Sequence, residues 1–237
     1  MTTEPDRPHP PIRSYALRRG RFTTAQQRAV EQWFSTFGIP YSAGLVDFDK
    51  AFGRAAPTVL EIGFGMGETT VAIAQQRPDI NFLGVEVFAA GVGALLKTIA
   101  EKKVCNIRIV QHDAVDVVRD MLREQSLTGV HIYFPDPWPK SRHHKRRLLK
   151  QPFLHLLASR LAPSAYLHCA TDWHDYALQM LTELSAEPAL VNMHDGYAPT
   201  PENPLCNRPV TKFHARGSRL GHATFDLLFA RRAGHDA

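Results

Sequence analysis

The sequence has few cysteines and no long hydrophobic run, which argues against a disulfide-bonded, a zinc-binding or a membrane-spanning protein. Its three cysteines, Cys105, Cys169 and Cys206, stand at unrelated spacings among 237 residues, which argues against a disulfide framework and against a zinc site. No apolar run approaches the roughly 20 residues that span a bilayer, and residues 1–12, with four prolines, lack the apolar core of a signal peptide. We therefore expect a soluble, cytoplasmic protein that binds neither membrane nor metal.

Acidic residues are missing from the segment 139–147, and this segment accounts for the whole positive excess of the chain. The formal net charge is +5. Five cations stand within eight residues: Lys140, Arg142, Lys145, Arg146 and Arg147. Charge runs are often plain solvated faces, but clustered positive charge beside a binding site favours an anionic partner such as a nucleic acid. His143 and His144 have no further ligands at metal-binding spacing, so we assign them to the same nucleic-acid-binding surface.

Short apolar runs alternate with segments of helical length from residue 58 onward. Strands are predicted at 58–63, 81–87, 106–113, 129–136 and 165–172, and helices at 68–76, 89–102, 115–125 and 148–161. This alternation predicts an α/β fold with a doubly wound, mostly parallel, Rossmann-like sheet. Two further apolar runs near the C-terminus have no long helix between them, so an antiparallel strand is expected there.

The first 57 residues differ in pattern from the rest of the chain. Residues 1–12 are expected to be disordered, a basic stretch follows, and residues 24–37 carry apolar side chains at helical spacing. We interpret 1–57 as an N-terminal basic arm and helix, and 58–237 as a single domain. No surface helix shows a self-complementary stripe, which favours a monomer over a homodimer.

A glycine-rich loop follows the first predicted strand, in the order Glu61, Gly63, Gly65 and Gly67. Glycines allow close backbone approach to a ligand at the carboxyl end of a strand. The spacing G-x-G-x-G differs from the G-x-G-x-x-G of nicotinamide-binding loops, the nearest competing interpretation. A carboxylate at Glu61 would repel a pyrophosphate but would suit the amino group of a methionine moiety.

Acids recur at the ends of the next three predicted strands. Glu86 could accept hydrogen bonds from ribose hydroxyls, and Asp113, followed by Ala114, could accept from an adenine amino group. Asp136 ends the fourth strand. A single acid at such a position could simply cap a helix, but four together suit a cation such as the sulfonium of S-adenosylmethionine.

Three prolines within five positions make the segment 134–140 (FPDPWPK) unusual. Because proline fixes φ and removes a backbone donor, neither helix nor strand can continue through it. The segment should be a stiff turn that holds Asp136 and Trp138 at the sheet edge. Trp138 is then a candidate stacking surface for a base, and the alternative is core packing against the last helix.

These elements together resemble the bacterial tRNA (guanine-N7)-methyltransferase family. The resemblance covers most of residues 13–229 and includes LEIGFGMGE, GVEV, FPDPWPKSRHHKRR, ATDW and TKFHARGSRLGH. It implies a class I methyltransferase fold, S-adenosylmethionine as cofactor, and methylation of the variable-loop guanine of tRNA, position 46 in standard tRNA numbering. Methylation of another RNA base or of a small molecule is the alternative. By resemblance the substrate-binding residues are Lys140, Asp172, Thr211, Lys212, Phe213 and His214.

One residue departs from the family pattern. The family usually has Thr-Lys-Phe-Glu where this chain has Thr-Lys-Phe-His, ending at His214. Asp172 is a candidate to supply the missing carboxylate contact. Because guanine N7 carries a lone pair and no proton, the catalytic role expected of Asp136 is that of an anchor rather than a general base.

Overall fold

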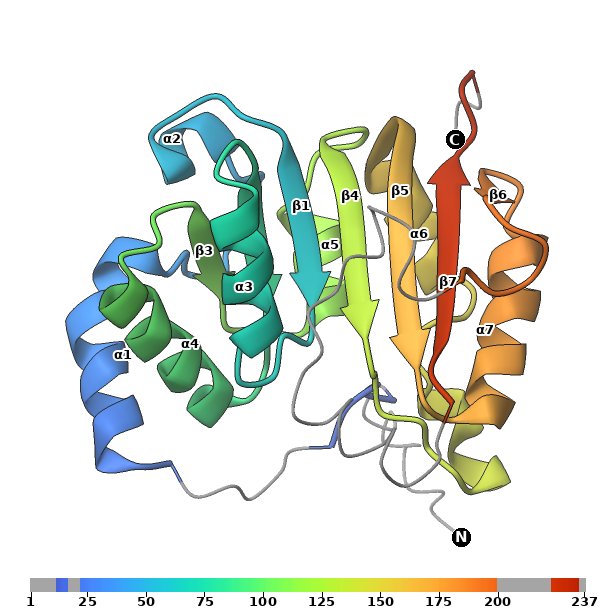
Figure 1. Ribbon diagram of the computed structural model, residues 1–237, viewed down its shortest axis with the longest axis horizontal. Helices are drawn as coiled ribbons and strands as arrows, with labels where there is room; N and C mark the ends of the chain where they lie inside the picture. Colours follow the sequence, from blue (N-terminus) through green and yellow to red (C-terminus); the bar gives the residue numbers. More distant parts are fainter. Residues whose placement is uncertain (1–11, 17–21, 200–222, 235–237) are drawn as a thin grey trace, which may run out of the picture.

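A seven-stranded sheet runs through the part of the chain that the computed structural model describes, residues 12–16, 22–199 and 223–234. The strands are β1 (Thr58–Ile62), β2 (Asn81–Val85), β3 (Ile107–Val110), β4 (Leu127–Tyr133), β5 (Leu161–Thr171), β6 (Leu190–Asn192) and β7 (Phe225–Arg231). Their order is β3-β2-β1-β4-β5-β7-β6. The first five strands are parallel, and β7 is antiparallel to both of its neighbours, as the opposed arrows of β5 and β7 show (Figure 1).

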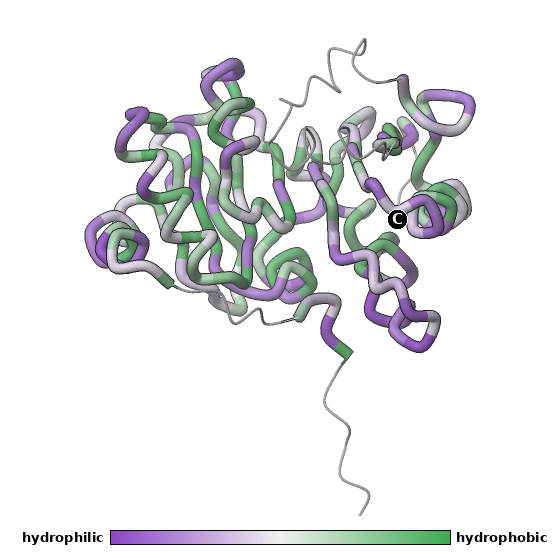
Figure 2. Tube along the Cα trace, turned by 60° about the horizontal axis from the view of Figure 1, so that its bottom comes forward, coloured by the Kyte–Doolittle hydropathy of each residue, from purple (hydrophilic) through white to green (hydrophobic). Residues whose placement is uncertain are grey.

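Helices cover both faces of this sheet. They are α1 (Thr24–Phe37), α2 (Phe48–Phe52), α3 (Glu68–Gln76), α4 (Ala89–Lys102), α5 (Ala114–Asp120), α6 (Phe153–Arg160) and α7 (His174–Ala186). In Figure 1, α1, α3 and α4 lie in front of β1, β2 and β3, whereas α5 and α6 lie behind the sheet. The strands are apolar along most of their length, while hydrophilic residues gather in the outer helices and loops (Figure 2). This arrangement confirms the predicted doubly wound α/β sheet with an antiparallel C-terminal strand.

The predicted helix at 24–37 is α1, and it lies directly against α4. Thr23 caps it through a reciprocal pair of contacts with Gln26. A Cβ on Gly93 of α4 would lie 2.6 Å from the carbonyl oxygen of Gln26, so only glycine allows the two helices to approach this closely. The chain after α1 then reaches the sheet edge, where the Ile39 N–H donates to the Ile109 carbonyl oxygen at 2.7 Å.

Two predicted helices are shorter in the structure than in the sequence pattern. The helix predicted at 115–125 ends at Asp120, and Gln125 beyond it has a left-handed φ of 53°. The helix predicted at 148–161 begins at Phe153, because Pro152 can stand at the start of a helix but not within it. The periodicity predicts no range for α2 or α7.

The strand order of the sheet indicates where a ligand would bind, because it reverses between β1 and β4. The chain proceeds from β1 through β2 to β3 in one direction and returns through β4 to β5 in the other. Open α/β sheets bind ligands at the carboxyl ends of the strands flanking this reversal, which here are β1 and β4. None of the described helices is long and apolar enough to cross a membrane.

Candidate active site

The glycine loop after β1 is shaped for a ligand. Gly63, Gly65 and Gly67 all have left-handed φ values, 75°, 57° and 77°, which other residues adopt only at a cost. No described atom lies within 4 Å of the position that a Cβ on Gly63 or Gly65 would occupy. A Cβ on Gly67 would lie 2.6 Å from the Leu95 side chain, so the loop also packs closely against α4. The backbone is therefore open on the side where a ligand can approach.

Glu61 is a buried carboxylate near the end of β1, just before this loop. It is 3% exposed, and among the described residues its Oε2 has no hydrogen-bond partner. Burial raises the pKa of Glu61 to about 7; the nearby Thr70 hydroxyl opposes the shift, and the charge of Glu86 adds to it. A buried polar atom without a partner is costly, so this oxygen is suited to a cationic or hydrogen-donating ligand.

Glu86 fastens the glycine loop to the end of β2. One carboxylate oxygen accepts from the Gly65 N–H at 2.9 Å. The other accepts from the N–H groups of Val87 and Phe88 at 2.8 and 3.0 Å. The oxygen that accepts from Gly65 retains a second lone pair, so the carboxylate can still accept from a ligand hydroxyl group.

Asp113 caps α5 and borders a cleft of about 600 Å³. Its Oδ1 accepts from the Val115 N–H at 3.0 Å, so the helix-cap interpretation of this acid is correct for one of its oxygens. The residues that line the cleft include Val87, His112 and Asp113 and the segments 12–15, 145–148 and 150–153. Residues 12–15 of the N-terminal arm therefore line this cleft, a contact between distant parts of the chain that no local sequence pattern indicates.

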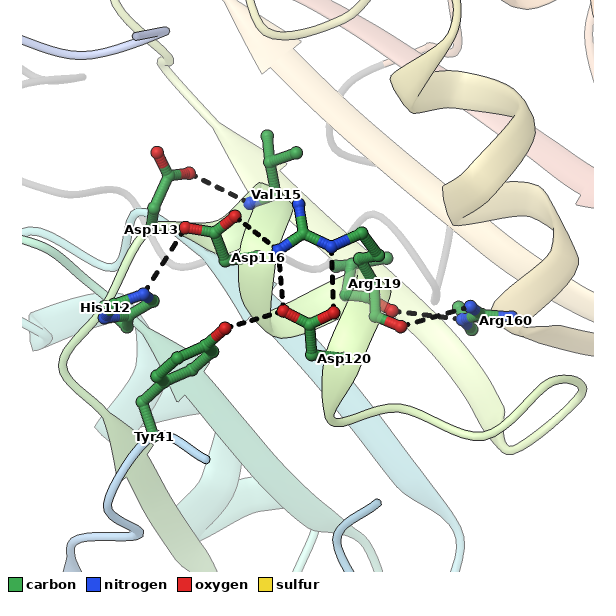
Figure 3. A network of polar contacts seen from close by, with 9 residues as sticks. Tyr41, His112, Asp113, Val115, Asp116, Arg119, Asp120 and Arg160 are labelled. Carbon is green, nitrogen blue, oxygen red and sulfur yellow. Dashed lines mark hydrogen bonds and ion pairs between the residues drawn. The ribbon is translucent and has the colours of Figure 1, made fainter. Parts of the chain in front are cut away.

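A polar network holds the base of this cleft in place (Figure 3). The Tyr41 ring stacks on His112 with 3.7 Å between ring centroids, and its hydroxyl donates to Asp120 at 2.6 Å. Arg119 bridges Asp116 at 2.8 Å and Asp120 at 2.6 Å. The network ties the segment after α1 to α5 and so fixes the backbone that carries Asp113.

The proline-rich turn at 134–140, which we call the reaction segment, contains two non-glycine residues in the left-handed region. Phe134 has a φ of 51° and Trp138 a φ of 47°. Such conformations cost about 1–3 kcal/mol each and persist where the surroundings over-determine them. The Phe134 N–H donates to the Ala170 carbonyl oxygen at 2.7 Å, which holds the start of the segment against β5. Asp136 lies half-buried between the two strained residues.

Trp138 contacts the N-terminal arm and the basic run. Its indole N–H donates to the Ser14 carbonyl oxygen at 3.0 Å, and the Arg146 guanidinium lies 5.0 Å from the ring centroid. His143 meets the ring edge-on at 5.9 Å. The indole N–H and one side of the ring are thus in contact with the protein, and stacking of a base on this ring stays a prediction.

Arg147 requires a correction, because the sequence analysis assigns it to the RNA-binding run. Its side chain is 1% exposed. The guanidinium donates to the Pro137 carbonyl oxygen at 2.9 Å, to Gln179 at 2.6 Å and to Asp175 at 2.5 Å. It also lies over the Tyr176 ring at 4.8 Å. Arg147 therefore fastens the reaction segment to α7, and its donors are not available to a phosphate.

Replacing Arg147 with methionine should lower the free energy of unfolding by roughly 2 kcal/mol, because the Pro137 carbonyl and Gln179 lose a buried donor. Chemical denaturation measures this. Arg142→Met is the matched control, since Arg142 is exposed, and it should leave unfolding unchanged. If Arg147→Met left stability intact but reduced the salt dependence of RNA binding, the predicted phosphate contact would be restored.

The other members of the basic run remain at the surface. The 3-10 helix η1 (Ser141–Arg146) follows the reaction segment, and Lys140, Arg142 and Lys145 are exposed. His144 lies 3.8 Å from Asp175. Partial burial and the neighbouring cations lower the pKa of His143. The described residues contain no group of three or more His, Cys, Asp or Glu that could hold a metal ion.

The remaining predicted substrate residues divide into two groups. Asp172 is exposed just beyond the end of β5, on the same edge of the sheet as the reaction segment. Thr211, Lys212, Phe213 and His214 lie outside the described residues.

Buried polar side chains on β4, β5 and β7 are not among the residues that the sequence analysis singles out. His131, His168 and Asp226 are each at most 3% exposed, and Tyr133 and Tyr166 lie beside them on the same face. The signal was available: polar residues recur at every second position within otherwise apolar strands, which places them on one face of a sheet.

Comparison with known proteins identifies related sequences and folds. A family model described as "Putative methyltransferase" matches residues 55–227. A "tRNA (guanine-N(7)-)-methyltransferase" of Bordetella pertussis is 62% identical over 220 residues, covering 93% of this chain and 85% of that protein. The protein of the same description from Aromatoleum aromaticum is 58% identical over 221 residues, covering 93% and 84%.

Solved structures share the fold at low identity. The 16S rRNA methyltransferase KamB superposes with a TM-score of 0.57 at 15% identity, covering 79% of this chain and 94% of that one. The 16S rRNA (adenine(1408)-N(1))-methyltransferase from Catenulisporales acidiphilia, solved as a mutant with cosubstrate SAM, has a TM-score of 0.53 at 13% identity, covering 81% and 94%. At these identities the likeness is one of fold.

Proposed function

Because this chain belongs to the tRNA (guanine-N7)-methyltransferase family, we propose that it transfers a methyl group from S-adenosylmethionine to guanine N7 of tRNA, at position 46 of the variable loop. The observation that carries the proposal is Glu61. Its buried oxygen without a described partner lies at the end of β1, beside an open glycine loop and the β1–β4 crevice.

The residues present fit S-adenosylmethionine. Glu61 would accept from the amino group of the methionine moiety, Glu86 from the ribose hydroxyls, and Asp113 from the adenine, with Ala114 beside it. The glycines at 63, 65 and 67 leave room for the chain of the ligand to pass close to the backbone. When bound, this cofactor supplies an electrophilic methyl group on a positively charged sulfur.

Asp136 acts on the base and not on a proton. Guanine N7 carries an in-plane lone pair and no proton at neutral pH, so no residue has to remove one. Asp136 instead accepts from the donors on the Watson–Crick edge of guanine and stabilises the positive charge that develops on the ring. The effect of Asp136 on the reaction depends on rigid placement of its side chain. Two features provide it: the left-handed backbone at Phe134 and Trp138, and the hydrogen bond from Arg147 to the Pro137 carbonyl oxygen.

The exposed cations after the reaction segment hold the RNA backbone. Lys140 at the end of the segment and Arg142 and Lys145 after it are exposed, and phosphate contacts fix the position of an RNA without reading its sequence. Extracting the guanine from its tertiary contacts costs a few kcal/mol, and these contacts help to offset it.

Charge reversal of Arg142 and Lys145 should weaken tRNA binding and reduce the slope of log affinity against log salt by about one per lost contact. Filter binding or fluorescence anisotropy at several salt concentrations measures the slope. Lys97→Glu is the control, because Lys97 lies near the end of α4 and pairs with Glu101, away from the crevice. An unchanged slope in the double variant would mean that the run is only a solvated face.

One assay tests the activity as a whole. The protein is incubated with methyl-labelled S-adenosylmethionine and undermodified tRNA, and the tRNA is then reduced and treated with aniline. Strand scission at position 46 is expected, because 7-methylguanine is labile to this treatment. Label in tRNA without such scission would indicate another base or atom, and labelled small molecules formed without RNA would indicate a small-molecule methyltransferase.

A further inference from the structure

Five polar side chains lie on one face of the sheet, on the neighbouring strands β4, β5 and β7. They are His131, Tyr133, Tyr166, His168 and Asp226. His131 is in register with His168 on the neighbouring strand. None of these residues has a role in the function proposed above, although burying so many polar groups is costly unless they are satisfied.

This group contains a hydrogen-bonded chain that ends at Tyr133. His168 Nε2 lies 2.8 Å from Asp226 Oδ1, and both side chains are fully buried. His168 Nδ1 lies 3.0 Å from the Tyr133 hydroxyl. An ionised Asp226 can only accept, so Nε2 carries the proton. In a neutral imidazole Nδ1 is then an acceptor, and the Tyr133 hydroxyl donates to it.

Tyr133 stands where the strand turns into the reaction segment. It is the last residue of β4, and Phe134 immediately after it has the left-handed φ of 51°. At the far end, Arg147 donates to the Pro137 carbonyl oxygen. A strained turn persists only where its surroundings hold it in place. The hydrogen bonds from Asp226 through His168 to Tyr133 hold the start of the reaction segment, and Arg147 holds the part near Pro137.

We propose that Asp226 and His168 are positioning residues: they hold the Tyr133 side chain, which fixes the start of the reaction segment and so the placement of Asp136. This inference rests on the proposed function only for the role of Asp136. Breaking these hydrogen bonds should therefore lower turnover more than it lowers cofactor affinity, because Glu61 lies on β1 and the glycine loop follows that strand.

The test is Tyr133→Phe, which removes one hydroxyl and little else. We expect kcat for tRNA methylation to fall on the order of tenfold to a hundredfold, as for a small misplacement of a catalytic group, with KM for S-adenosylmethionine within twofold of wild type. Hydrogen exchange at the amides of Phe134, Asp136 and Trp138 should accelerate. The matched control is Tyr166→Phe, which removes a hydroxyl bonded to His131 at 2.9 Å on the same face and should leave kcat and this exchange unchanged.

A second pair of variants guards against misfolding. Asp226→Asn keeps an oxygen acceptor for His168 and should retain most of kcat, whereas Asp226→Leu should lose it as Tyr133→Phe does. Wild-type kcat in Tyr133→Phe, or equal losses of kcat in Tyr133→Phe and Tyr166→Phe, would overturn the proposal. A wild-type protein unable to methylate tRNA would instead refute the proposed function, while the exchange comparison would still test how Tyr133 holds the segment.

Discussion

Replacing Asp136 with alanine should reduce methyl transfer to tRNA by about a thousandfold while the protein stays folded. Asp136 lies in the reaction segment beyond β4, the strand that pairs with β1 and thus with Glu61. Removing a preorganised group that stabilises developing charge costs about a hundredfold to a thousandfold, and the substrate base also loses its orientation. Single-turnover methylation with enzyme in excess over tRNA measures the loss, and circular dichroism and thermal unfolding establish that the fold is kept.

Two further variants make this result specific. Asp136→Asn keeps a hydrogen-bond acceptor without the charge and should lie between wild type and Asp136→Ala. Asp79→Ala removes a surface acid that pairs with Arg77 at 3.5 Å before β2, at the opposite edge of the sheet, and should not affect turnover. Near-normal turnover in Asp136→Ala would remove this residue from the reaction centre.

The parts of the site that sequence predicts well are those set by local rules. Glu61 and Glu86 stand at the ends of short apolar runs, and the ends of parallel strands meet at one edge of a sheet. The helices at 24–37, 68–76 and 89–102 begin and end where their periodicity and flanking residues predict. Each of these features depends on residues within a few positions of one another.

The parts that sequence misses depend on contacts between distant residues. A run of five cations does not reveal which one turns inward, and the partners of Arg147 on α7 are Asp175 and Gln179, 28 and 32 positions away. In the same way, the hydrogen bond between Trp138 and Ser14 joins residues 124 positions apart. The sequence therefore does not show that the indole of Trp138 is held by the N-terminal arm, and stacking of a base on this ring stays a prediction.

Glu61 leads to the second large prediction, in which stability and function change in opposite directions. Burial raises its pKa from 4.5 to about 7, so between these values the folded protein holds a proton that the unfolded chain has released. Stability must then fall as pH rises through this window, by roughly 3 kcal/mol in total. Glu61→Gln carries no charge, so at pH 8 the ligand-free variant should be more stable than wild type by up to that amount. At pH 4.5 the two should be equally stable.

The same carboxylate should make the affinity for the cofactor rise with pH, in the range where the stability of the ligand-free protein falls. The ionised form is the one that attracts an ammonium group, so the affinity of wild type for S-adenosylmethionine should rise tenfold per pH unit below about 7 and level off above it. Glu61→Gln should bind on the order of a hundredfold more weakly at pH 8, the worth of a charged hydrogen bond, and its affinity should not vary across this window. Calorimetric titration between pH 5.5 and 8 measures both proteins, with Glu101→Gln, an exposed acid on α4, as the control that should follow wild type. A wild-type affinity that is constant over this range would show that Glu61 does not meet the ammonium group. A variant that is more stable but unable to bind would show that the fold tolerates this buried acid only because the ligand requires it.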